Sequence, residues 1–212
     1  MTSRFSAIAV LAMATGLGAC SSPAPIHYYT LLPPTAVPPA AASAAVTQPP
    51  SSFLIDVLPV GLPEHLDQQS LVVRKSSGGG AVSVLDEERW VGPLGDELRN
   101  ALSVQLAERL GTQDVSGLGS SADQKVLRIK VQIRRMDAWL GNQVQLEAGW
   151  SLGLAQGSKA RLVCQGRFTE PTQDGYPALV QAQQRAVGAM AARIAMDARA
   201  WGASQQAKCS AE

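Results

Sequence analysis

The feature that most constrains the fold is the segment 126–134, in which apolar and polar residues alternate from Leu127 to Arg134. Successive side chains of a strand point to opposite faces, so this period predicts a strand with one buried and one solvated face. Residues 144–154 repeat the pattern and 160–168 continue it, with turn residues at 139–142 and 156–159. This part of the chain therefore predicts an antiparallel meander. The apolar positions of the first strand are Leu127, Ile129, Val131 and Ile133, and the polar ones are Arg128, Lys130, Gln132 and Arg134.

Shorter apolar segments predict further strands nearer the N-terminus. Residues 26–32 and 53–60 are rich in β-forming residues, and 71–75 can pair with 81–85 across the stretch 76–80. That stretch contains three consecutive glycines, which can cradle phosphate when they precede a helix. Here they join two predicted strands, so we interpret the segment as a hairpin turn.

Two segments carry the spacing of amphipathic helices. The first follows Trp90, has Pro93 in its first turn and ends at Gly111, and the second covers about 176–201, with Asp174 as its expected cap. Runs of antiparallel strands separated by two helices indicate an α+β fold, with both helices packed on one face of an antiparallel β-sheet. The apolar stripe of the first helix is Leu94, Leu98, Ala101, Leu102, Leu106 and Leu110, and that of the second is Leu179, Ala186, Met190, Ile194 and Trp201.

The first 20 residues have the order of a lipoprotein signal. Arg4 precedes an apolar run at 5–14 that is shorter than the roughly 20 residues a membrane-spanning helix requires. The run ends in Leu17-Gly-Ala-Cys20, which resembles the lipobox read by the lipoprotein signal peptidase. We therefore predict a signal peptide over 1–19 and lipid attachment at Cys20, whose several acyl chains would form a durable anchor. The alternative is an ordinary cleaved signal with a cysteine nearby.

The mature chain divides into four parts. Residues 20–32 form the lipidated N-terminus and first strand, and 33–52 contain six prolines among mostly small residues. Such a composition buries too little apolar surface to offset the entropy of ordering, so we predict a flexible loop there. The folded α+β domain covers 53–202, and 203–212 form a C-terminal tail.

Two cysteines remain after Cys20. In an oxidising compartment, Cys164 and Cys209 could form a disulfide that ties the tail to a strand. The alternative is a buried thiol and a loose thiol in the tail, because sequence does not reveal the short Cα separation that a disulfide needs.

The residues give no support for an enzyme, a metal site or a cofactor. The chain has two histidines, His27 beside the anchor and His65 in a proline-bounded loop. Glu64 and Asp67 flank His65, but no second cluster completes a metal or acid–base site, so we interpret this group as a solvated turn. No Gly-x-Ser-x-Gly motif is present.

The cationic row Arg128, Lys130 and Arg134 has two interpretations. It is either a solvated strand face, which Gln145 and Glu147 on the partner strand could neutralise, or a contact for phospholipid head groups or a protein partner. Removing residues 1–19 takes away one arginine and no acid, which brings the formal net charge to zero. A neutral, exported chain is not expected to bind nucleic acid.

A set of short motifs extends along nearly the whole mature chain. They are the lipobox, Tyr28-Tyr-Thr-Leu31, Asp56-Val-Leu-Pro-Val60, Leu62-Pro-Glu-His-Leu-Asp67, Leu71-Val-Val-Arg74, Arg89-Trp90, Pro93-Leu94, Trp150 and Tyr176-Pro-Ala-Leu-Val180. In this order they resemble the ABC-type transport auxiliary lipoproteins of the PqiC/YmbA type.

The resemblance implies an outer-membrane lipoprotein that self-associates and docks onto an MCE-domain transport subunit, as part of a lipid transport system between the two membranes. Ser21 and Ser22 fit the outer membrane, since no aspartate follows Cys20. The alternative is a monomeric lipid-binding or envelope-maintenance lipoprotein.

Overall fold

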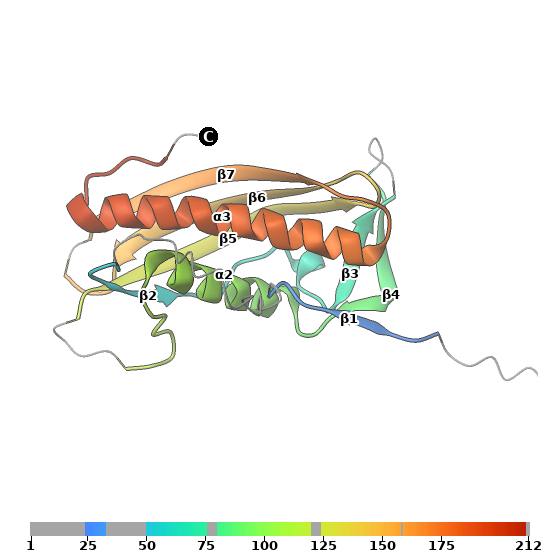
Figure 1. The fold of residues 1–212 in the computed structure, drawn as a ribbon, viewed down its shortest axis with the longest axis horizontal. Coiled ribbons are helices and arrows are strands. Elements are labelled where there is room, and N and C mark those ends of the chain that lie inside the picture. Colours follow the sequence, from blue (N-terminus) through green and yellow to red (C-terminus); the bar gives the residue numbers. More distant parts are fainter. Residues whose placement is uncertain (1–23, 33–49, 76–79, 120–123, 158, 211–212) are drawn as a thin grey trace, which may run out of the picture.

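A computed structural model shows one sheet with both helices on the same face (Figure 1). It describes residues 24–32, 50–75, 80–119, 124–157 and 159–210. The predicted signal peptide, Cys20 and most of the proline-rich loop 33–52 lie outside these residues. The elements in chain order are β1 (His27–Tyr29), β2 (Leu54–Val57), the short 3-10 helix η1 (Glu64–Leu66), β3 (Ser70–Arg74), β4 (Val82–Trp90), α2 (Leu94–Leu110), β5 (Val126–Trp139), β6 (Gln143–Leu154), β7 (Arg161–Pro171) and α3 (Tyr176–Ser204).

The α+β class is confirmed, but the sheet is mixed rather than wholly antiparallel. Its strand order is β1-β4-β3-β5-β6-β7, with β2 paired to β5. The predicted hairpin β3–β4 and the meander β5–β6–β7 are antiparallel. However, β1 runs parallel to β4, and both β2 and β3 run parallel to β5. Alternation along a strand fixes its buried face and not its direction, and the long connections between these strands permit parallel pairing.

The register of the meander explains why its alternation is so regular. Ile129 pairs with Leu152, which in turn pairs with Leu162, so their side chains share the face that the helices cover. One register shift interrupts β5 between Ile133 and Arg135. Such a bulge changes which face the following side chains occupy.

Both helices bury the predicted apolar stripes. All eleven stripe residues are buried, from Leu94 in α2 to Trp201 in α3. Gly111 ends α2 in a left-handed conformation with φ 60°, and its N–H donates to the carbonyls of Ala107 and Glu108. The helix α3 extends to Ser204, a few residues beyond the predicted end.

The predicted cap of α3 is wrong. Gly175, with φ 95°, is the N-cap residue, and no side chain caps the helix. The carboxylate of Asp174 lies instead against Gly141 in the β5–β6 turn, where a Cβ would collide with it. Gly141 itself has φ 67°, so the turn and the cap both use a backbone conformation that favours glycine.

The N-terminal segment is built into the fold rather than attached to it. Leu31 is fully buried, and its N–H and the Thr30 hydroxyl both donate to one carboxylate oxygen of Glu97 in α2, at 2.9 and 2.7 Å. The side chain of Gln184 in α3 donates to the Thr30 carbonyl at 2.9 Å. Residues 27–31 are thus held by the sheet and by both helices.

Candidate functional site

The sheet face turned away from the helices is the site at which the predicted cationic residues gather. The middle strand, β6, presents small residues there, while its neighbours β5 and β7 present long cationic side chains. Val163, in the middle of β7, is 71% exposed on this face. The residues concerned are Arg128, Lys130 and Arg134 of β5, Gly149, Ser151 and Gly153 of β6, and Arg161, Val163 and Arg167 of β7.

The predicted row Arg128, Lys130 and Arg134 is brought together on this face. Glu147 forms an ion pair at 2.9 Å with Arg167 of β7. Arg128 pairs with Asp56 of β2, its Nε lying 2.9 Å from Oδ2, and Arg134 donates to the Gln165 side chain at 3.2 Å. Arg128 and Arg167 are thus each paired with an acid, whereas Arg134 bonds a neutral amide.

An open depression of about 670 Å³ borders this face at the edge strand β7. The sequence did not predict the contributions of Arg167 and Arg193, because β7 pairing and the position of α3 bring them together. Polar and charged side chains line most of this depression, so it suits an ionic or hydrogen-bonding contact rather than an acyl chain. The lining residues are Arg134, Glu147, Ala148, Gln165, Gly166, Arg167, Thr169 and Arg193.

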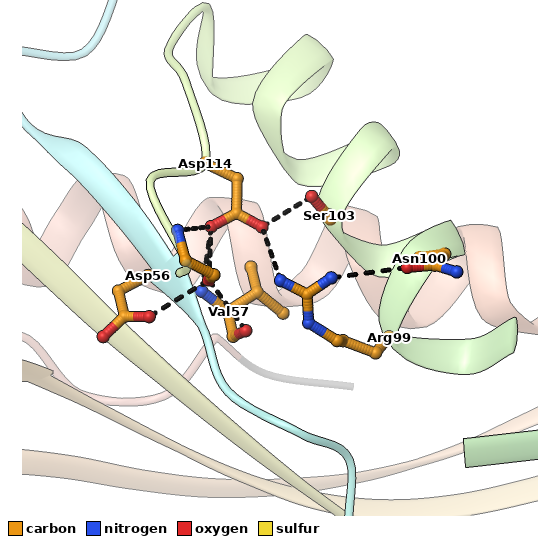
Figure 2. A network of polar contacts seen from close by, with 7 residues as sticks. Asp56, Val57, Arg99, Asn100, Ser103 and Asp114 are labelled. Atoms are coloured by element: carbon orange, nitrogen blue, oxygen red, sulfur yellow. Dashed lines mark hydrogen bonds and ion pairs between the residues drawn. The ribbon is translucent and has the colours of Figure 1, made fainter. Parts of the chain in front are cut away.

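A second polar group fixes the segment after α2 against β2 (Figure 2). The carboxylate of Asp114 accepts hydrogen bonds from the hydroxyls of Ser103 and Ser116, both at 2.6 Å. It also accepts the N–H groups of Ser116 at 3.0 Å and Val57 at 3.2 Å, and Arg99 lies 3.7 Å away. The network joins α2, β2 and the segment between them, so its role is structural.

Asp114 makes stability depend on pH. Burial raises the pKa of its carboxyl, but the hydrogen bonds from Ser103, Ser116 and Val57 together outweigh burial and lower the pKa below its usual value. The ionised form therefore stabilises the fold above the unfolded-state pKa of about 4, and this contribution is lost as pH falls through the lower folded-state pKa.

We accordingly expect Asp114→Asn to lower the free energy of unfolding by roughly 1–3 kcal/mol at pH 7, because the hydrogen bonds lose their charged acceptor. Urea denaturation at pH 7 and again at successively lower pH measures this, and the difference from wild type should narrow below about pH 4. Glu108→Gln, at an exposed position on α2 away from its first turn, is the control and should change little. An equal loss at every pH would show that the carboxylate charge is not the source of the stability.

A third polar group holds the C-terminal segment. Cys164 of β7 and Cys209 form a disulfide with Cα atoms 5.7 Å apart. Next to it, the buried carboxylate of Asp197 accepts hydrogen bonds from the Trp150 indole at 2.9 Å and from the N–H and hydroxyl of Ser210, both at 2.7 Å. The last described residues are thus fastened to both α3 and the sheet.

The loop with Glu64, His65 and Asp67 forms the 3-10 helix η1 and the residue after it, with all three side chains exposed. Within the described ranges, no three His, Cys, Asp or Glu residues are grouped so that they could hold a metal ion. The described part of the chain also has no helix that is long and apolar enough to span a membrane.

Comparison with known families decides the classification. The model of the family "ABC-type transport auxiliary lipoprotein component" matches residues 29–195. The chain belongs to this family. The match begins at Tyr29, the last residue of β1, and ends within α3, so it spans β2 to β7 and most of the last helix.

Solved structures with the same fold support the architecture of this auxiliary lipoprotein component. A crystal structure of an uncharacterised protein has a TM-score of 0.61 and 21% identity, covering 82% of this chain and 98% of its own. The protein XCC0632 from Xanthomonas campestris, assigned to family DUF330, has a TM-score of 0.53 and 14% identity, covering 76% and 90%. At these identities the likeness concerns the fold alone. No curated protein matches the chain significantly.

Proposed function

We propose that this protein is a lipid-anchored docking subunit of an MCE-type ABC transport system that moves lipids between the inner and outer membranes. It is held on the periplasmic face of the outer membrane by acyl chains on Cys20, self-associates and binds the MCE-domain subunit. The protein contributes to envelope integrity because the transport system to which it belongs does so. It catalyses no reaction and uses no cofactor.

The family match over 29–195 is the observation that carries the proposal, because it assigns the chain to auxiliary components of ABC transport. The N-terminal segment adds a mechanical argument. Residues 30 and 31 are bonded to Glu97 and Gln184, so a short stretch separates the folded body from Cys20. A body confined near a membrane gains effective concentration, and weak contacts then suffice for assembly.

The packed interior favours docking over the monomeric carrier. A carrier needs an apolar cavity for acyl chains. The space between the helices and the sheet is filled instead by fully buried side chains such as Leu102, Ile129 and Met190. The depression beside β7 is open and is lined mostly by polar side chains.

The mature protein, purified in a mild detergent, tests the choice between the two functions. Its mass by light scattering and its bound lipids by mass spectrometry should show an assembly without stoichiometric phospholipid. A monomer at high concentration that retains about one phospholipid per chain would contradict docking and establish the carrier.

A further inference from the structure

Two stretches of strand edge on opposite sides of this sheet carry opposite charge. At one side, β1 pairs with β4 at Glu88, Arg89 and Trp90 only. Among the described residues, the stretch 82–87 of β4 therefore has no strand neighbour on that side, and both Asp86 and Glu87 are exposed. At the other side, β7 is the last strand and presents exposed Arg161 and Arg167.

The charge difference extends beyond the two edges. The strands β5, β6 and β7 carry an excess of cations, while β4 carries an excess of acids, in a chain whose formal net charge is only +1. A nearly neutral protein with segregated charge has a basic side and an acidic side that attract each other. The cations are Arg128, Lys130, Arg134, Arg135, Arg161 and Arg167 against Asp137, Glu147 and Glu170, whereas β4 has Asp86, Glu87 and Glu88 against Arg89.

Open strand edges need a partner or a cover. Unpaired backbone groups along a strand of this length act as a template for another strand. The depression beside Gln165, Arg167 and Thr169 shows that this stretch of β7 is accessible in the described structure. Exposed Val82 and Val84 on β4, at 45% and 50%, add apolar surface to the acidic edge.

We propose that the β7 edge of one copy, from Gly166 to Glu170, pairs with the β4 edge of a second copy, from Ser83 to Glu87. The inference rests on the proposed self-association and names its surface. The two edges cannot meet within one subunit, since β3, β5 and β6 lie between them. The contact is therefore head-to-tail, and its repetition closes a ring or extends a filament.

Strand directions fit this pairing. β4 is antiparallel to β3, β3 is parallel to β5, and the meander reverses direction twice more, so β7 and β4 of one subunit point in opposite directions. Subunits arranged around an axis along the strands would thus pair β7 with β4 in the antiparallel sense. Aligning Arg167 with Asp86 also places Thr169 opposite Val84, which combines an opposite-charge pair with a β-branched pair.

Single charge-reversing substitutions, made in the full mature protein and studied in detergent, test the contact through the association constant. Arg167→Glu and Asp86→Arg should each reduce the association constant about tenfold or more, because like charges then face each other. An equimolar mixture of the two variants should restore assembly, since each altered edge meets the opposite charge. Arg109→Glu and Glu108→Arg, at exposed positions on α2, are the matched controls. Thermal melting checks that the variants fold.

The outcomes separate this inference from the proposed function. A wild-type protein that stays monomeric would contradict the proposed self-association and this interface with it. Normal assembly of both charge-reversed variants would overturn the interface alone, as would reduced assembly that the mixture does not restore. Reduced assembly of each variant alone, together with restored assembly of their mixture, supports pairing between a basic and an acidic edge.

Discussion

Cys20→Ala should accumulate as an unprocessed precursor and be lost from the outer-membrane fraction. The lipoprotein pathway, to which the sequence Leu17-Gly-Ala-Cys20 points, attaches the first lipid to the cysteine sulfur before cleavage. A side chain without sulfur stops both steps. The effect should be nearly complete, because several acyl chains contribute about 0.8 kcal/mol for each buried methylene and all of this binding is lost.

Fractionation of membranes, with the mass of the protein determined for each fraction, provides the measurement. Ser22→Ala is the control, since it changes a residue after the predicted cleavage site and leaves Cys20 in place. A Cys20→Ala protein of mature mass in the outer-membrane fraction would show that Cys20 does not carry the anchor.

Leu102→Ala should lower the free energy of unfolding by roughly 2–5 kcal/mol. The side chain is fully buried in α2, and its truncation leaves a cavity between the helix and the sheet. A loss of this size is a large fraction of the roughly 5–15 kcal/mol that stabilises a typical domain.

Denaturant titration compares this variant with Val104→Ala, whose side chain is 50% exposed on the same helix. The control should differ from wild type by about 0.5 kcal/mol or less. Equal denaturation midpoints for Leu102→Ala and wild type would mean that α2 does not pack against the sheet through the face that carries Leu102.

The core could be predicted well from the sequence because burial leaves a periodic signature. Ile129 and Ile133 alternate with polar residues, and Leu98 and Leu102 recur one helical turn apart, so each pattern indicates which face is buried. The direction of β1 and β2 leaves no such signature. Parallel pairing with β4 and β5 depends on contacts between segments that are far apart in the chain.

Residues of the candidate site were predictable only where they lie on one strand. Arg128, Lys130 and Arg134 followed from alternation, whereas Arg167 and Arg193 join them through pairing and helix packing. Asp114 lies in a segment without periodicity, so its hydrogen bonds had no sequence signal. Asp174 resembled a helix cap, but Gly175 is the N-cap and the Asp174 carboxylate lies against Gly141, a contact that the local sequence does not indicate.

Partner capture tests the central claim most directly. Cells that express the lipidated protein with an affinity tag are treated with a cleavable cross-linker, and the captured proteins are identified by mass spectrometry. We predict enrichment of an MCE-domain subunit over the same experiment with a tagged, unrelated outer-membrane lipoprotein. Equal recovery of MCE-domain proteins from both samples, with the protein intact in the outer membrane, would contradict its role as a docking subunit.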